Sequence, residues 1–242
     1  MCLLLPLVGR RNAGPKFYRL ILLLSLAFLL CAAVAHILAG ARTLAIYDVV
    51  AMLTLAFLLT VLRYPRRFIY RLAAITADLV LVAVTVYAYH LAVDAPALWW
   101  SIAGALTSSA LTGSVMLAML LGHWYLVVRG MPIEPLMRLS RALLIATIAK
   151  ILIVAGVLLY LSPGGLEYGS PLYRVMIGQG IFFWMRVGWG LIGPLVLYPM
   201  IWGTVKIRST MAATGILYVA VVAVIIGEVL GTWLSVLERI PL

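Results

Sequence analysis

The sequence predicts an all-α polytopic integral membrane protein, a bundle of seven transmembrane helices, and two observations support that prediction. The first is composition: 66% of the 242 residues are hydrophobic and only 10% are charged, whereas a soluble domain carries about 25% charged residues. The second is the length of the apolar runs, because a helix needs about 20 residues to cross the hydrocarbon core of a bilayer. These runs do not alternate between apolar and polar residues, which favours helices over barrel strands.

The spans are placed where apolar runs of sufficient length are separated by short segments that contain glycine or proline. We expect the whole chain, residues 1–242, to form a single transmembrane domain, and the first span to be retained rather than removed as a signal peptide. The expected spans are residues 18–40, 43–63, 68–92, 97–128, 138–161, 173–204 and 209–235.

The distribution of basic residues predicts the orientation of the bundle. With the N-terminus in the cytoplasm, 13 of the 18 Lys and Arg residues fall in cytoplasmic segments and 3 in outer segments, while Lys150 and Arg186 fall inside spans. Cytoplasmic loops of membrane proteins carry such an excess of positive charge. We therefore expect a cytoplasmic N-terminus, an outer C-terminus and insertion in a bacterial inner membrane. This distribution also argues against nucleic-acid binding as the meaning of the net charge of +11.

Five charged side chains lie more than one helical turn inside the expected spans: Asp48, Asp78, Lys150, Arg186 and Glu228. A charge inside the bilayer is costly, and such groups either pair with one another or mark a route for protons or substrate. One interpretation is that they fix helix neighbours, for instance by pairing Asp78 with Lys150 and Arg186 with Glu228. The other is that they line a proton or substrate path, and the sequence does not choose between the two.

All three histidines also lie inside spans, His36 and His90 toward the outer side and His123 toward the cytoplasm. Neutral histidine is a common axial ligand of haem iron. His36 and His90 are therefore candidate metal ligands of a b-type haem, provided that the first and third spans are neighbours. The alternative is that each histidine forms a hydrogen bond with a neighbouring helix or with water at the membrane surface.

His123 shares one stripe of the fourth span with Ser101 and Thr112, because a spacing of 11 residues returns a helix to nearly the same face. One interpretation is a packing face of small residues and hydroxyl groups. The other is a pocket for a quinone head, in which His123 exchanges a proton and Trp124 and Tyr125 form the walls. Aromatic residues are also common at this depth as membrane anchors.

The sixth span combines repeated glycines with Gln179 and Arg186, which are seven residues apart and share a helix face. Glycines permit the close approach of another helix or of a flat ligand. The Arg186 guanidinium could then hold a haem propionate, a quinone oxygen or a substrate carboxylate. Both residues are therefore candidate cofactor-binding residues, although the glycines could equally be packing notches around an Arg–Glu pair.

From these groups we expect a membrane subunit of a redox or respiratory electron-transfer assembly that binds b-type haem, quinone or both. Its expected partners are the lipid bilayer and either other membrane subunits or further copies of the chain. One alternative is a small transporter or channel with a charged pathway through Asp78, Lys150, Arg186 and Glu228. Another is a purely structural subunit. The sequence contains no HExxH motif and no phosphate-binding glycine loop, so it assigns no catalytic residue and leaves enzyme activity open.

Overall fold

Seven long apolar helices make up the computed structural model of this protein, and each overlaps one of the expected spans. The structure describes residues 4–61, 67–94, 97–128 and 130–242, and the side chains of residues 10–12, 67–71 and 164 lie outside that description. The helices long and apolar enough to cross a membrane are Ala13–Leu38, Arg42–Val61, Leu72–Val93, Leu98–Val127, Glu134–Leu161, Gly180–Lys206 and Thr210–Glu238. Among the described residues, the number and order of long apolar helices thus agree with the seven predicted spans.

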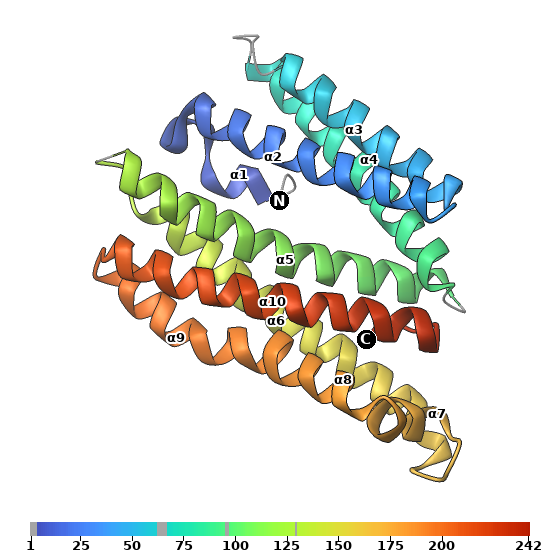
Figure 1. The fold of residues 1–242 in the computed structure, drawn as a ribbon. Helices are drawn as coiled ribbons and strands as arrows, with labels where there is room; N and C mark the ends of the chain where they lie inside the picture. The colour runs from blue at the N-terminus through green and yellow to red at the C-terminus, as the bar shows by residue number, and fades with distance from the viewer. Residues whose placement is uncertain (1–3, 62–66, 95–96, 129) are drawn as a thin grey trace.

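The α-helices in Figure 1 run in chain order. They are α1 (Leu5–Val8), α2 (Arg10–Leu38), α3 (Arg42–Val61), α4 (Arg67–Val93), α5 (Leu98–Val127), α6 (Glu134–Leu161), α7 (Pro171–Tyr173), α8 (Gly180–Met185), α9 (Gly193–Lys206) and α10 (Thr210–Glu238). Helices suit this sequence because every backbone N–H and C=O in hydrocarbon must find its partner within the chain. Three residues of the predicted charge bias, Arg63, Arg66 and Arg129, lie outside the described residues.

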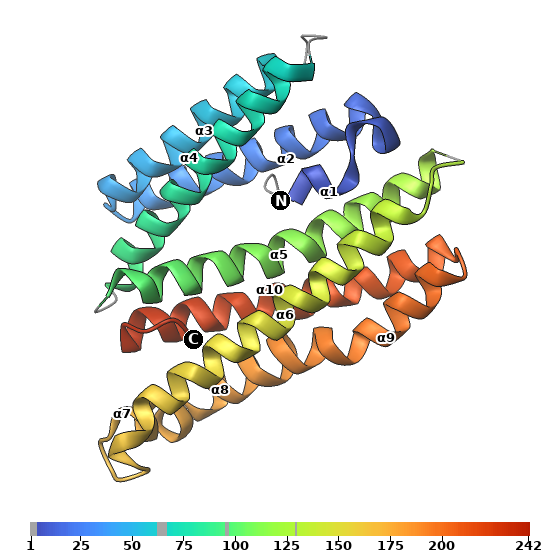
Figure 2. The ribbon, with the colours of Figure 1, turned by 180° about the vertical axis from the view of Figure 1, so that it is seen from behind.

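The helices form two groups. In the N-terminal group, α2 packs on α3 and α3 packs on α4. In the C-terminal group, α5 packs between α6 and α10, while α9 packs against α6 and α10. The two groups are joined mainly where α4 packs on α5, and Figures 1 and 2 show them side by side from opposite directions.

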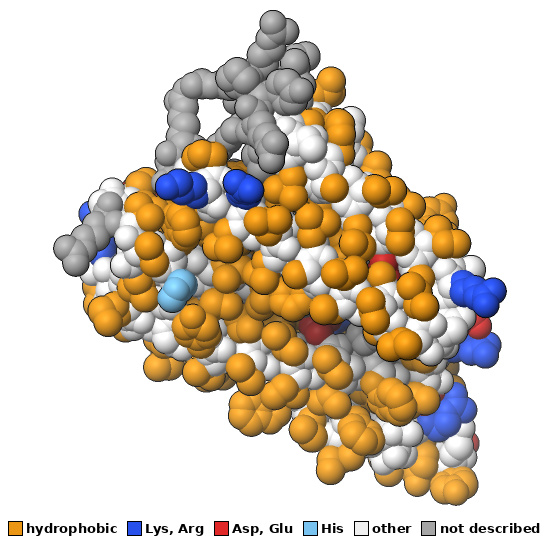
Figure 3. Space-filling view, turned by 45° about the horizontal axis from the view of Figure 1, so that its top comes forward, with side chains coloured by type: hydrophobic (Ala, Val, Ile, Leu, Met, Phe, Trp, Pro, Cys, Tyr) orange, Lys and Arg blue, Asp and Glu red, His pale blue; other side chains and the backbone are white. Residues whose placement is uncertain are grey.

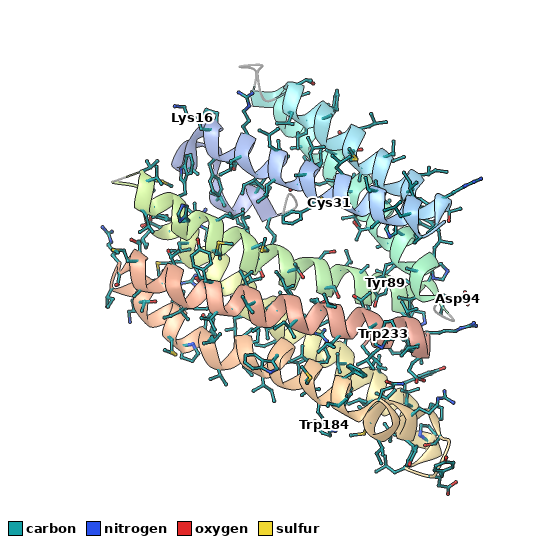
Figure 4. All side chains as sticks on the ribbon, in the orientation of Figure 1. Lys16, Cys31, Tyr89, Asp94, Trp184 and Trp233 are labelled. Atoms are coloured by element: carbon teal, nitrogen blue, oxygen red, sulfur yellow. The ribbon has the colours of Figure 1, made fainter. Side chains whose placement is uncertain are left out.

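The outer surface of the bundle is mainly apolar. Figure 3 shows hydrophobic side chains over most of one face, with Lys and Arg gathered toward its edges. This is the arrangement that a bilayer requires, since apolar side chains then meet the hydrocarbon and charges meet the aqueous layers. Figure 4 labels Lys16 at one end of the bundle and Asp94 at the other, and we refer to these as the Lys16 end and the Asp94 end.

The sixth span, expected as residues 173–204, is not one regular α-helix. Two π-helical segments, Arg174–Gly178 and Arg186–Ile192, lie on either side of α8. Pro194 then lies in the first turn of α9, where the missing N–H of proline is tolerated. A π-helical turn loosens the regular backbone pattern and occurs frequently at functional sites. The irregular backbone places Arg186 at the junction of α8 and the second π-helical segment.

Near the N-terminus the chain folds back onto the bundle before the first span begins. α1 is packed against α6 and α2, and Leu5 and Val8 are buried. The hydroxyl of Tyr18 donates a hydrogen bond to the carbonyl oxygen of Leu5 at 2.9 Å. Phe17 also packs against Trp124 of α5, with ring centroids 5.6 Å apart. These contacts link the N-terminal and C-terminal groups at the Lys16 end.

Candidate functional site

Three ionisable side chains from three segments meet inside the C-terminal group. Arg186 Nη2 donates a hydrogen bond to Glu228 Oε1 of α10 at 2.8 Å. Lys150 Nζ of α6 donates to Ser108 Oγ of α5 at 3.0 Å, and the Ser108 hydroxyl also contacts the Glu228 carboxyl group. Arg186 is 0% exposed and Lys150 is 1% exposed. We call Ser108, Lys150, Arg186 and Glu228 the buried polar cluster.

Glycines on α10 explain how a guanidinium fits between closely packed helices. Gly227 and Gly231 flank Glu228, four residues apart. A Cβ atom on Gly231 would lie 2.6 Å from Arg186 Nε, and one on Gly227 would lie 3.1 Å from Arg186 Nη1 and would collide with the backbone of Gly190. Small residues at this spacing let two membrane helices approach closely. The Gly-x-x-x-Gly pattern was the sequence signal for this contact, and it was missed.

Arg186 keeps buried donors that have no acceptor. Within the described part of the chain, Nε and Nη1 of Arg186 form no hydrogen bond. Arginine carries five N–H donors and no acceptor, and leaving buried donors unpaired costs about 1–3 kcal/mol or more when the group is charged. The cluster also contains two cations, Lys150 and Arg186, for one carboxylate, Glu228. The cluster can therefore accommodate a group that supplies hydrogen-bond acceptors and carries one negative charge.

Tyr89 and the segment after α10 cover the cluster toward the Asp94 end. The Tyr89 hydroxyl donates to Ser235 Oγ at 3.4 Å, and the backbone N–H of Leu242 donates to the same oxygen at 2.9 Å. The chain turns back at Arg239, which has a left-handed φ of 56°, and residues 240–242 are buried. A Cβ atom on Gly104 of α5 would lie 2.9 Å from the Tyr89 hydroxyl oxygen, so this cover is closely packed.

The structure therefore confirms one predicted ion pair and contradicts the other. Arg186 pairs with Glu228 as expected. The suggested pairing of Asp78 with Lys150 is wrong, because Lys150 donates to Ser108 instead. Asp78 is half-buried on α4, and among the described residues it forms no hydrogen bond or ion pair. Three of the four residues of the predicted charged pathway thus lie together, and Asp78 lies apart from them.

His36 and Asp48 form a second polar contact, at the Asp94 end of α2 and α3. His36 Nδ1 lies 2.6 Å from Asp48 Oδ2, and the side chains are 36% and 14% exposed. Asp48 was expected on a proton or substrate path, and the structure places it beside this histidine.

His90 has a different partner, because its Nδ1 lies 2.8 Å from Ser101 Oγ of α5. The helix pair α4–α5 thus holds His90, whereas α2–α3 holds His36. Among the described residues, no group of three or more His, Cys, Asp or Glu side chains is arranged to hold a metal ion. Haem ligation by His36 and His90 stays a prediction.

The aromatic residues beside His123 do not share its surroundings. His123 is exposed on the outside of α5. Trp124 contacts Phe17, and Tyr125 is buried and donates its hydroxyl hydrogen to the carbonyl oxygen of Pro132. The quinone pocket expected around His123 therefore stays a prediction.

Gln179 lies between the first π-helical segment and α8, and it is half-buried. No hydrogen bond joins its side chain to Arg186 among the residues that the structure describes. An apolar groove of about 660 Å³ lies on the outer side of α8, α9 and α10, lined by residues that include Trp184, Gly188 and Ala223. Figure 4 shows Trp184 on the outside of the bundle, so the groove faces the lipid and not the buried polar cluster.

Comparison with known protein families, with curated proteins and with solved structures finds no match to this chain. Its function is therefore argued from the arrangement of its own residues.

Proposed function

We propose that this protein is a small membrane transporter in which a polar solute passes through the buried polar cluster. The supporting observation is that Lys150, Arg186 and Glu228 converge from α6, the second π-helical segment and α10. Ionisable groups that face the interior of a membrane bundle are expensive to bury and commonly mark substrate or proton routes. A purely structural role would not require an excess of positive charge at this place.

The interrupted sixth span supports the same proposal. Transporters commonly build their substrate sites near the middle of the membrane, where spanning helices are broken. Here the break is π-helical, at Arg186–Ile192, and it adjoins the cluster directly.

The structure corresponds to a state in which the cluster is closed on both sides. Tyr89 and residues 240–242 cover it toward the Asp94 end. Toward the Lys16 end, α6 and α10 contribute Leu143 and Leu217 to the apolar core, each 0% exposed. Transport would then require one side to open at a time, as alternating access demands.

Flux into liposomes tests the proposal. The purified full chain would be reconstituted, and the uptake of radiolabelled acetate, nitrate, sodium and glucose measured. We expect uptake of one of these solutes, and we expect Glu228→Gln to reduce it at least tenfold because the pair with Arg186 is lost. Glu238→Gln is the matched control, since Glu238 lies on the same helix and pairs with Arg174, whose side chain is 55% exposed. No uptake of any solute, or equal uptake in both variants, would overturn the proposal.

A haem-binding electron-transfer subunit is the second candidate, and the His36–Asp48 contact favours it. A carboxylate beside one ring nitrogen orients a histidine whose other nitrogen binds a metal. The apolar groove on α8, α9 and α10 offers a place for the tail of a quinone in the same assembly. An oxidised-minus-reduced visible spectrum of the purified protein would show haem bands that disappear in His36→Ala, and a flat spectrum would contradict this candidate.

We also propose that the Lys16 end faces the cytoplasm of a bacterial cell, on the strength of the 13-to-3 bias of basic residues. Single cysteines at Ile207 and at Glu167 would report the two ends after Cys2 and Cys31 are replaced by serine. A membrane-impermeant maleimide should label Glu167→Cys in intact cells and Ile207→Cys only after permeabilisation. The reverse pattern would invert the orientation.

A further inference from the structure

We propose that the solute bound by the buried polar cluster is a small anion with one negative charge, held by the free N–H donors of Arg186 and by the Lys150 ammonium group. The passage of this anion across the membrane rests on the proposed function. Its binding step is separate and is tested without any measurement of transport.

The charge of the cluster selects an anion. With all groups ionised, Lys150 and Arg186 contribute two positive charges and Glu228 one negative charge. An uncompensated charge in an apolar interior is strongly disfavoured. A monoanion would neutralise the cluster, a neutral solute would leave it at one positive charge, and a cation would raise it to two.

The hydrogen-bonding groups select the same class of ligand. The free groups on Arg186 are donors, the N–H of Nε and both N–H bonds of Nη1. Lys150 carries three N–H donors, and one of them is directed at Ser108. A ligand must therefore supply acceptors, and a carboxylate or nitrate group offers planar oxygens that match a guanidinium.

The packing around Arg186 limits the size of the anion. A methyl group on Gly190 would lie 2.6 Å from Arg186 Nη1, and one on Gly231 would lie 2.6 Å from Nε. The free donors thus lie directly against the backbone of two glycines. Even an added methyl group finds no room beside these donors, so binding of any anion requires α10 to separate from the π-helical segment. A small anion such as acetate or nitrate requires the least separation.

Binding to the purified full chain in detergent tests the inference. Melting temperature and heat of binding would be measured with sodium acetate and sodium nitrate, and with acetamide as the neutral analogue of acetate. Acetate and nitrate should raise the melting temperature and bind, whereas acetamide should do neither. Arg186→Gln should weaken acetate binding at least tenfold. Arg174→Gln, which removes an exposed arginine from the same stretch of chain, should bind acetate as the unmodified protein does.

A second variant keeps the test informative if Arg186→Gln does not fold. Lys150→Met removes one cation and leaves the pair of Arg186 with Glu228 intact, so we expect a folded protein that binds acetate at least tenfold more weakly. Unchanged acetate binding in Lys150→Met and in a folded Arg186→Gln would overturn the inference. So would binding of acetamide, or uptake of glucose or sodium, without any binding of anions. Uptake of glucose or sodium would still leave the transporter proposal standing. Anion binding without uptake of any solute would instead support the inference and overturn the transporter.

Discussion

The N-terminal and C-terminal groups each contain a short contact between a carboxylate and a nitrogen-bearing side chain of a neighbouring segment, and the two contacts differ in burial. His36 and Asp48 approach to 2.6 Å, yet the histidine side chain is 36% exposed. Arg186 and Glu228 are 2.8 Å apart, and the arginine side chain is 0% exposed. The distances are similar, so burial is what separates the two contacts. An exposed contact exchanges its hydrogen bonds with water, whereas a buried one depends on the protein for every partner.

Two of the helices beside Arg186 are also more buried than the first span. In the most apolar window of each helix, 56% of the residues of α5 and 44% of those of α10 are buried, compared with 17% in the first span, while the sixth span and α3 are alike at 28%. The glycines of α10 bring backbones together around Arg186, whereas the contact between His36 and Asp48 lies near the end of the bundle. Because of this close packing, we expect the addition or removal of a few atoms to lower stability more in the C-terminal group than in the N-terminal group.

The largest effect is expected from breaking the buried pair. Arg186→Gln leaves the Glu228 carboxylate without its charged partner, and removing one member of a buried pair costs about 3–5 kcal/mol. The free energy of unfolding, measured by circular dichroism in mixed detergent and dodecyl sulfate micelles, should fall by that amount.

The double variant Arg186→Met with Glu228→Met is the control, because replacing both charges by apolar side chains of similar size is often neutral for stability. It should recover most of the loss in stability while failing to bind acetate. If Arg186→Gln were as stable as the unmodified protein, the buried pair would not be what distinguishes the two groups.

The sequence was sufficient to predict the spans and part of the buried polar cluster. Charges are so rare inside the spans that their positions alone identified Lys150, Arg186 and Glu228. The spans were predictable because they depend on composition, which is the same however a helix is rotated about its axis. The choice of partners was harder, because it depends on which face each helix turns inward. Asp78 and Lys150 have compatible depth and charge, yet Ser108 occupies the place beside Lys150.

The remaining members of the site were not predictable for a physical reason. Ser108, Tyr89 and Ser235 are ordinary hydroxyl residues, and hydroxyl groups in membrane helices usually donate to their own backbone, as Ser140 does to Leu136. Gln179 itself departs from helical geometry, with φ −103° and ψ 24°, so the expected common face of Gln179 and Arg186 depended on a regular helix that begins only after Gln179.

The second largest effect is expected at the closest approach of two backbones. Gly227→Ala would place a methyl group against the backbone of Gly190, and overpacking of this kind costs about 1–3 kcal/mol. Gly215→Ala is the matched control on the same helix, because a Cβ atom there meets nothing within 4 Å. Alanine favours a helix over glycine by about 1 kcal/mol, so Gly215→Ala should be neutral or stabilising. Equal effects of the two substitutions would mean that α10 does not pack tightly there.

A smaller effect is expected from the contact in the N-terminal group. Asp48→Asn keeps the shape of the side chain and removes its charge, and partly exposed ion pairs contribute about 0.2–1 kcal/mol. The free energy of unfolding should therefore fall by about 1 kcal/mol or less. A loss as large as that of Arg186→Gln would show that the two contacts are equivalent, and the comparison between the groups would fail.

The smallest effect is expected for the contact between Asp94 and Arg239, which are 3.2 Å apart and have side chains 73% and 70% exposed. Asp94→Asn is the suitable change, because Asp94 has a left-handed φ of 50° and asparagine tolerates that conformation well. The free energy of unfolding should change by less than about 0.5 kcal/mol, and added salt should abolish the difference by screening.

This contact also joins the end of α4 to the residue at which the chain turns back over the buried polar cluster. A loss well above about 1 kcal/mol that persists in high salt would show that residues 240–242 depend on Asp94 to stay in place. The cover of the cluster would then be held by a surface charge. The expected small loss would instead mean that burial of Leu242 and its hydrogen bond to Ser235 hold the cover, so that packing dominates at the rim of the C-terminal group as it does at its centre.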